Sequence, residues 1–222
     1  MSYAFFAPLV RLYAPTLLYP THNLPKPQMP FIPYGFNIPK VVQASKIKNP
    51  KAIVIFVGGF CDTIMCAVYR AFIAFDEPSC LKIYTSFKIQ HLFTSWLVPL
   101  VQCKLPIFVI AHSWGASNFY KALQNLDSKN VSLEYLLKLD PVGYHLPHTR
   151  PIDIKLWENV YIANKWAYLR RPNIVALIGH PWNAIKVSDR NIIMHKPAHH
   201  ASIMAMIEAS GFHSEIHRII RV

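Results

Sequence analysis

The sequence predicts an α/β fold, with a mostly parallel central sheet and helices on both faces. Two patterns predict this fold. Apolar runs of strand length alternate along the chain with segments whose apolar residues recur every three or four positions. The runs lack polar alternation, which is typical of strands covered by helices on both sides. A length of 222 residues is sufficient for one such domain and its core.

The predicted elements begin at about residue 51. In chain order they are a strand at 51–57, a helix at 64–75 capped by Asp62 or Thr63, a strand at 81–87, an amphipathic segment at 90–102, a strand at 107–111 followed by a helix, strands at 133–139, 159–163 and 191–195, and a helix at 201–210 that ends at Gly211. A His- and Pro-rich loop precedes 159–163. The stretch 165–187 has no clear period, and an insertion or a hairpin both fit it.

Residues 1–50 differ from the rest of the chain. They hold half of the 18 prolines and no acidic residue, and the run 20–39 favours extended or polyproline backbone. Their many aromatic residues argue against simple disorder. We expect an arm packed on a domain formed by 51–222, with a membrane-facing or partner-facing element as the alternative. Prolines interrupt the apolar residues 1–20, so no transmembrane span is expected.

The chain is strongly basic, with a formal net charge of +12 from 23 Lys and Arg against 11 Asp and Glu. Such a balance favours anionic partners, for example a phospholipid surface, a nucleic acid or an acidic protein. The lysines are scattered and accompany no nucleic-acid motif, so no specific nucleic-acid binding is expected. With 53% apolar residues, the chain has either a large core or some exposed apolar surface.

The four cysteines show no Cys-x-x-Cys spacing: Cys61, Cys66, Cys80 and Cys103. We interpret them as small buried hydrophobic residues and not as a disulfide framework. This pattern favours a reducing compartment such as the cytoplasm. Delivery to a membrane or outside the cell stays open as an alternative.

One strand, turn and helix carry a candidate nucleophile. The apolar run 107–111 leads into Ala111-His112-Ser113-Trp114-Gly115, and a helical pattern follows. The turn is one residue away from the Gly-x-Ser-x-Gly nucleophile elbow, with Ala111 at the first glycine position. An ordinary capping serine is the structural alternative. At an elbow, the helix N-terminus beside the serine would favour negative charge on a reacting oxygen.

Further polar residues follow later predicted strands. Asp140 ends the strand at 133–139, and the pair His199-His200 follows the last strand. Sites in parallel sheets form at the carboxyl ends of strands, so these residues and Ser113 are expected to meet. Serine is a weak nucleophile that needs a neutral histidine to take its proton and a carboxylate to orient that histidine. The sequence therefore predicts a Ser–Asp–His site, and the order of the three residues is that of α/β-hydrolases.

A hydrolase also needs N–H groups for the oxyanion of its tetrahedral intermediate. The N–H of Trp114, directly after the serine, is one candidate. The turn Gly58-Gly59-Phe60 after the first strand supplies the other, from Phe60 or Gly59. Glycines at this turn let the backbone approach a substrate.

Taken together, these motifs make residues 50–210 resemble a small α/β-hydrolase of the lipase/esterase type. Val-Gly-Gly-Phe at 57–60 is similar to the family's His-Gly-Phe oxyanion turn, and Ala-His-Ser-Trp-Gly-Ala at 111–116 is similar to its Gly-His-Ser-x-Gly-Gly elbow. Leu-Asp-Pro-Val at 139–142 resembles the Leu-Asp-Pro turn of lipases. His-His-Ala at 199–201 stands where the family keeps its histidine. Gly58, Ala111 and Ala116 depart from the family pattern.

The resemblance implies a serine hydrolase that cleaves a carboxylic ester, lipid ester or thioester through an acyl-enzyme and needs no cofactor. Ser113, Asp140 and His200 would be catalytic, and Trp114 with Phe60 or Gly59 would form the oxyanion hole. The substrate would be a small-molecule or lipid ester, and an anionic membrane surface is a candidate partner. A non-catalytic binding or scaffold protein on the same fold is the alternative, which the altered glycine positions keep open.

Alternatives also exist for single residues. His199 is the alternative base, because adjacent side chains point apart and only one of the pair fits the site. Asp189 is the alternative acid, although its place before the strand at 191–195 reads as a turn. His195, His199 and His200 form a local cluster, but no His-Glu-x-x-His is present, and Pro197 breaks the helical spacing of the first two. No metal site is therefore predicted.

Overall fold

The structure is a computed structural model, and it describes residues 50–60, 62–85, 87, 97, 101, 104–126 and 131–221. Several predictions lie outside this part of the chain. They are the N-terminal arm up to residue 49, nearly all of the amphipathic segment 90–102, and the environments of Cys61 and Cys103. In the described part, no helix has both the length and the apolar character needed to cross a membrane.

Six described strands form one sheet in which every neighbouring pair is parallel. The order across the sheet is β2 (Cys80–Thr85), β1 (Ala52–Val57), β3 (Ile107–His112), β4 (Ser132–Leu139), β5 (Asp153–Ile162) and β6 (Arg190–Met194). Every residue of β1 and β3 is buried, as continuous apolar runs require. The α/β class predicted from the sequence is confirmed.

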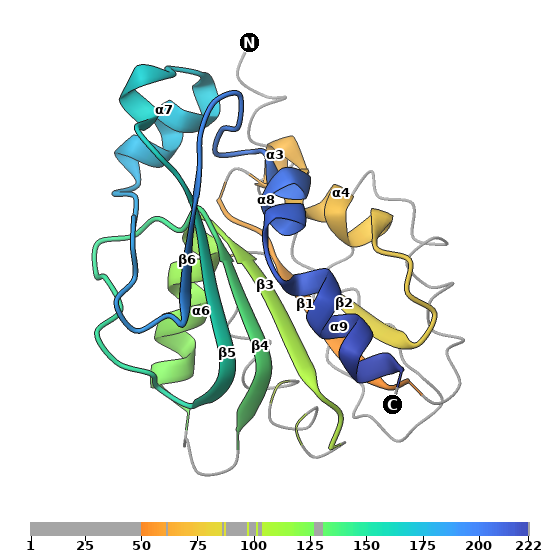
Figure 1. The fold of residues 1–222 in the computed structure, drawn as a ribbon. Helices are drawn as coiled ribbons and strands as arrows, with labels where there is room; N and C mark the ends of the chain where they lie inside the picture. The colour runs from red at the N-terminus through yellow and green to blue at the C-terminus, as the bar shows by residue number, and fades with distance from the viewer. Residues whose placement is uncertain are drawn as a thin grey trace.

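Helices cover both faces of this sheet (Figure 1). The helix α6 (Trp114–Gln124) packs on one face. The other face carries α4 (Ala67–Ala74), α8 (Ile203–Ala209) and α9 (Phe212–Ile220). The short helices α3 (Asp62–Met65) and η5 (Lys165–Ala167) follow β1 and β5, and α7 (Arg171–Ile178) follows η5. Both α3 and α7 lie at one end of the sheet.

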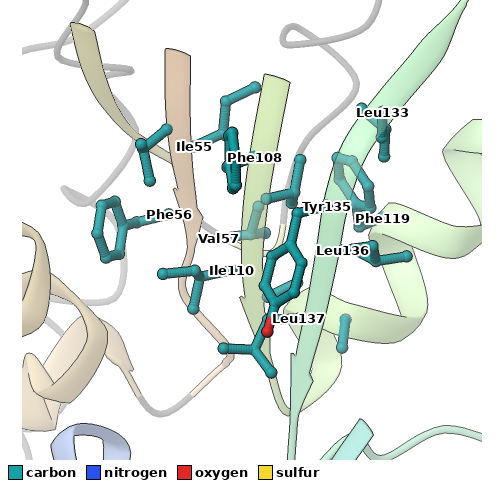
Figure 2. Close-up of a cluster of buried hydrophobic side chains, with 14 of the residues drawn as sticks. Ile55, Phe56, Val57, Phe108, Ile110, Phe119, Leu133, Tyr135, Leu136 and Leu137 are labelled. Carbon is teal, nitrogen blue, oxygen red and sulfur yellow. The ribbon is translucent and has the colours of Figure 1, made fainter. Parts of the chain in front are cut away.

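The core lies along the central strands. Figure 2 shows side chains from β1, β3 and β4, such as Ile55, Phe108 and Tyr135, together with Phe119 of α6. All four are at most 1% exposed. Complete burial of these apolar side chains is the main favourable contribution to folding, at about 1.5–3 kcal/mol for each large side chain. It also makes the strand ends a rigid base for the residues that follow them.

The predicted helix at 64–75 is wrong as a single helix. The chain forms α3 and then α4, separated by Cys66 in the left-handed region (φ 52°). Asp62 does not cap the helix in the expected way. It lies in α3, and its carboxylate accepts the N–H groups of Val68 and Tyr69 at the start of α4, at 2.6 and 3.2 Å. Cys80 is buried, as predicted, but Cys66 is only half-buried.

Three later predictions also need correction. The strand predicted at 159–163 begins earlier, at Asp153. Its first half was not predicted because polar residues alternate with apolar ones there. The stretch 165–187 is not a hairpin, since it contains the helices η5 and α7 between β5 and β6. The helix predicted at 201–210 is α8, which begins at Ile203 and ends at Ala209, before Gly211 as predicted; the helix α9, which was not predicted, follows at once.

Candidate active site

The predicted site residues gather where the strand order changes direction. From β1 the chain passes to β2 on one side and then to β3 on the other. A crevice at the carboxyl ends of such diverging strands is the usual place for a ligand in a parallel α/β sheet. Gly58-Gly59 follows β1, Ser113 follows β3 and Asp140 follows β4. The sheet therefore brings these turns to one edge.

Ser113 stands at the tight turn between β3 and α6. Its backbone has φ 56° and ψ −131°, a conformation that costs a non-glycine residue energy. The turn is held by the Ser113 N–H, which donates to the Leu139 carbonyl at 3.1 Å, and by the Val142 N–H, which donates to the Ser113 carbonyl at 3.4 Å. Both bonds tie the turn to the end of β4.

The glycines around this turn have no room for a side chain. A Cβ on Gly115 would lie 2.6 Å from the Gly58 carbonyl oxygen, and one on Gly59 would lie 2.6 Å from the Ser113 Cβ. A Cβ on Gly58 would lie 2.6 Å from Asp62 Oδ2 and 2.6 Å from the Tyr84 hydroxyl oxygen. The β1 turn therefore passes directly beside Ser113.

His200 connects Ser113 to Asp140. Its Nε2 lies 3.0 Å from Ser113 Oγ, and its Nδ1 lies 2.6 Å from Asp140 Oδ2. A carboxylate only accepts hydrogen bonds, so Nδ1 carries the proton, and Nε2 of the neutral ring accepts the serine hydroxyl. All three residues are buried. The arrangement is a continuous polar chain from a hydroxyl to a carboxylate, with the imidazole free to take up a proton.

Asp140 is held from several directions. Its Oδ1 accepts the Ile162 N–H at 3.0 Å and faces Lys165 Nζ at 2.7 Å. Burial acts to raise the pKa of Asp140. The hydrogen bond with His200 and the charges of His200 and Lys165 outweigh burial and lower that pKa to about 2. The carboxylate is thus ionised throughout the neutral range.

His112, the residue before Ser113, packs against His200, with ring centroids 4.5 Å apart. Its Nε2 donates to the His200 carbonyl oxygen at 2.8 Å. Burial, followed by the charge of His200, lowers the pKa of His112 to about 3, so the ring is neutral at ordinary pH. A neutral ring beside His200 supports its position without repelling the positive charge that it would acquire.

The predicted oxyanion residues lie beside Ser113. Trp114 is the first residue of α6, so its N–H has no partner four residues back within the helix. The ring of Phe60 lies 6.3 Å from the ring of Trp114 and 5.5 Å from that of Phe87. With Gly59 against Ser113, the backbone after β1 and the start of α6 flank the hydroxyl on neighbouring sides.

The alternative residues lie elsewhere. Asp189 forms an ion pair with Arg150 at 2.5 Å and accepts the Trp157 N–H at 2.7 Å. His199 is half-buried, and its Nδ1 accepts the Ala201 N–H at 3.3 Å. The structure thus brings Asp140 and His200 to Ser113, whereas the recorded partners of Asp189 and His199 are different groups. No cluster of three His, Cys, Asp or Glu able to hold a metal occurs among the described residues.

Two polar residues of the site were missed in the sequence. Lys165 contacts Asp140, and Asn173 of α7 accepts the His200 N–H on its Oδ1 at 2.8 Å. Both come from the stretch 165–187, which gave no clear pattern. A lysine and an asparagine within a basic segment carry no local signal of burial, although both side chains are buried here.

The sequence matches no protein-family model and no characterised protein. Among solved structures, the chain is similar to the crystal structure of TT1662 from Thermus thermophilus, with 9% identity and a TM-score of 0.41. That similarity covers 75% of this chain and 90% of the other. At this level of likeness, the similarity does not bear on activity.

Proposed function

We propose that the protein is an α/β-hydrolase that cleaves carboxylic esters, of the lipase and esterase type, with Ser113 as nucleophile. The polar chain of Ser113, His200 and Asp140 is the observation that supports this most. Its two contacts, 3.0 and 2.6 Å, join residues 87 and 60 positions apart in the sequence. The positive φ of Ser113 is further support, because a capping serine needs no such strain.

In the proposed reaction, Ser113 Oγ attacks the acyl carbon while its proton passes to His200 Nε2. Asp140 stabilises the resulting imidazolium through Nδ1–H and holds the ring in place. The carbonyl π electrons move onto the oxygen, where the N–H groups of Trp114 and of Phe60 or Gly59 stabilise the charge. When the carbonyl reforms, the alkoxide leaves and takes the proton from His200. An acyl-enzyme on Ser113 and a free alcohol are the products.

Water then releases the acyl group. His200 Nε2 accepts a proton from the water as its oxygen attacks the acyl carbon. The second tetrahedral intermediate collapses, the Ser113 oxygen leaves and regains its proton from His200, and a carboxylic acid departs. No cofactor takes part in this sequence. Each proton transfer uses the same nitrogen, which is why the orientation of His200 matters in both halves.

A row of aromatic rings beside Ser113 supports an acyl substrate. Phe60 contacts Trp114, Trp114 lies 6.4 Å from Tyr144, and Tyr144 lies 4.6 Å from His180. Phe60 and Tyr144 are 45% and 66% exposed. Exposed apolar rings next to a buried nucleophile suit an apolar chain that has to reach Ser113 from solvent. We therefore propose a small-molecule or lipid ester as substrate.

A fluorophosphonate probe tests the proposal, because it reacts only with an activated serine. The folded wild-type chain should be labelled, and Ser113→Ala should not be. Ser132→Ala, at an exposed serine that begins β4, is the matched control and should be labelled like the wild type. A correctly folded wild-type chain that resists labelling would favour the alternative, a non-catalytic binding or scaffold protein on this fold.

A further inference from the structure

Lys165 is a buried lysine at the candidate active site. It is the first residue of η5, and its side chain is 3% exposed. Its Nζ lies 2.7 Å from Asp140 Oδ1 and donates to the Ile162 carbonyl oxygen at 3.0 Å. A buried ammonium is costly unless it is paired. Asp140 supplies that pair, so Lys165 and the proposed catalytic acid are bound to each other.

The carboxylate of Asp140 is consequently shared between two partners. Oδ2 faces His200 and Oδ1 faces Lys165. Once His200 takes the proton of Ser113, one negative charge lies between two positive ones. An Asp140 already paired with Lys165 stabilises an imidazolium less than an unpaired carboxylate would. The pairing therefore holds the carboxylate in position and places a second positive charge against Asp140.

We propose that Lys165 is a positioning residue that fixes the Asp140 carboxylate toward His200 and extends the active range of His200 to lower pH. This inference rests on the proposed hydrolase function. A histidine base works only when it is unprotonated, so weaker proton affinity keeps it active in more acidic solution.

The other titratable groups around His200 act differently. His112 stacks on the ring, and burial keeps it neutral. His199 is the sequence neighbour of His200, and the charge of Arg170 acts on His199 from the start of α7. Among the described residues, Lys165 is the only lysine or arginine that forms an ion pair with Asp140. Its removal therefore changes the charge on the carboxylate side of His200 specifically.

The test compares the pH dependence of Lys165→Met with that of the wild type. Both the labelling rate with a fluorophosphonate and the ¹H–¹⁵N NMR titration of the His200 ring should be measured. In Lys165→Met, the acid limb of the rate and the His200 titration should both move up by about one pH unit. Lys165→Gln, which can still donate to Asp140 but carries no charge, should move in the same direction.

Two further variants serve as controls. Lys165→Arg keeps the charge and should leave the acid limb near its wild-type position. Lys155→Met removes an exposed lysine that pairs with Glu134 near the amino end of β5, and should shift neither curve.

A neutral variant that is folded and slower, but whose acid limb and His200 titration do not move, would overturn the proposal and leave Lys165 as a packing residue. If the His200 titration moves but fluorophosphonates do not label the chain, the result would count against the hydrolase function. It would still support the coupling of Lys165 to His200.

Discussion

At the scale of single residues, the carboxylate that orients His200 is the clearest point to test. Asp140 is fully buried and lies 2.6 Å from His200 Nδ1, whereas Asp189 is bound to Arg150 and the Trp157 N–H. Asp140→Asn should therefore lower kcat/KM for a model ester by about 10⁴-fold, because an amide stabilises the wrong ring tautomer and no imidazolium.

Asp189→Asn is the matched control for that change. It should leave turnover close to wild type and cost about 1 kcal/mol of stability through weaker contacts to Arg150 and Trp157. Steady-state kinetics and urea unfolding of both variants measure the two effects. Loss of turnover in Asp189→Asn alone would show that the acid assignment is wrong.

A second residue, Lys138, lies apart from the proposed chemistry. It is fully buried in β4, and its Nζ has no hydrogen-bond partner in the described part of the chain. The rings of Tyr120, Trp157 and Trp182 surround the amine, with centroids 4.6, 4.4 and 5.0 Å away. Burial lowers the pKa of Lys138 well below its ordinary value. The folded state therefore holds the amine neutral at a pH where the unfolded chain binds a proton.

This difference makes stability depend on pH. Because the unfolded state binds the extra proton, the free energy of unfolding should rise as pH increases toward the ordinary lysine pKa of about 10.4, and fall as pH decreases. Lys138→Met should abolish this contribution and stabilise the fold at pH 7. Urea unfolding at pH 7 and pH 9 provides the measurement. A variant less stable than wild type at pH 7 would mean that the rings stabilise a charged amine.

At the scale of elements, α7 holds the proposed base in place. Asn173 accepts the His200 N–H on Oδ1, and its Nδ2 donates to the Tyr168 carbonyl at 2.7 Å. Asn173→Ala should loosen the loop before α8 and lower kcat/KM by about 10- to 100-fold, since a small misplacement of a catalytic group is costly.

The loosening of the loop before α8 should also be detectable independently of activity, as faster hydrogen exchange of the His200 amide in Asn173→Ala. Asn183→Ala changes an exposed asparagine between α7 and β6 and serves as control for both measurements. Unchanged exchange and kinetics in Asn173→Ala would show that α7 does not position His200.

At the scale of the whole molecule, charge and exposed apolar surface support an anionic lipid surface as partner. The net charge is +12, and residues 164–187 contain no Asp or Glu. Large apolar side chains in η5, α7 and the link between them are exposed, with Trp166 at 71%, Leu169 at 59% and Ile178 at 72%. Arg170 and Arg171 lie at the start of α7. This combination is typical of segments that lie on a membrane surface.

We therefore expect binding to vesicles that contain phosphatidylserine, weakening as salt increases, and little binding to neutral phosphatidylcholine vesicles. Trp166→Ala combined with Ile178→Ser should weaken the binding by about 100-fold or more, because a large apolar side chain that the membrane buries contributes about 1.5–3 kcal/mol. Ile193→Ser, at a 51% exposed isoleucine of the edge strand β6, is the control. Vesicle flotation measures the binding of the wild type and of each variant to both vesicle types. Equal binding to both vesicle types would contradict an electrostatic contribution.

The sequence by itself determined the features that depend on local pattern. The mostly apolar strands β1, β3 and β4 predicted a parallel sheet, because strands covered by helices on both faces have few polar residues. Ser113 and Asp140 could be identified as candidates because each directly follows such a run, and parallel strands end at one edge. Two predictions from local pattern were wrong. Cys66 interrupts the helix predicted at 64–75 through its backbone conformation, and polar residues alternate with apolar ones in the first half of β5, which was not predicted as a strand.

Only the tertiary structure decided the contacts between distant parts of the chain. Which of His199 and His200 lies against Ser113 depends on how the loop before α8 meets Asn173, and no local pattern encodes that meeting. Lys165 is likewise an ordinary basic residue in sequence, and it becomes a partner of Asp140 only because η5 folds over the end of β4. Hydrogen bonds act over about 3 Å, so such pairings are determined by the packing that places the backbones.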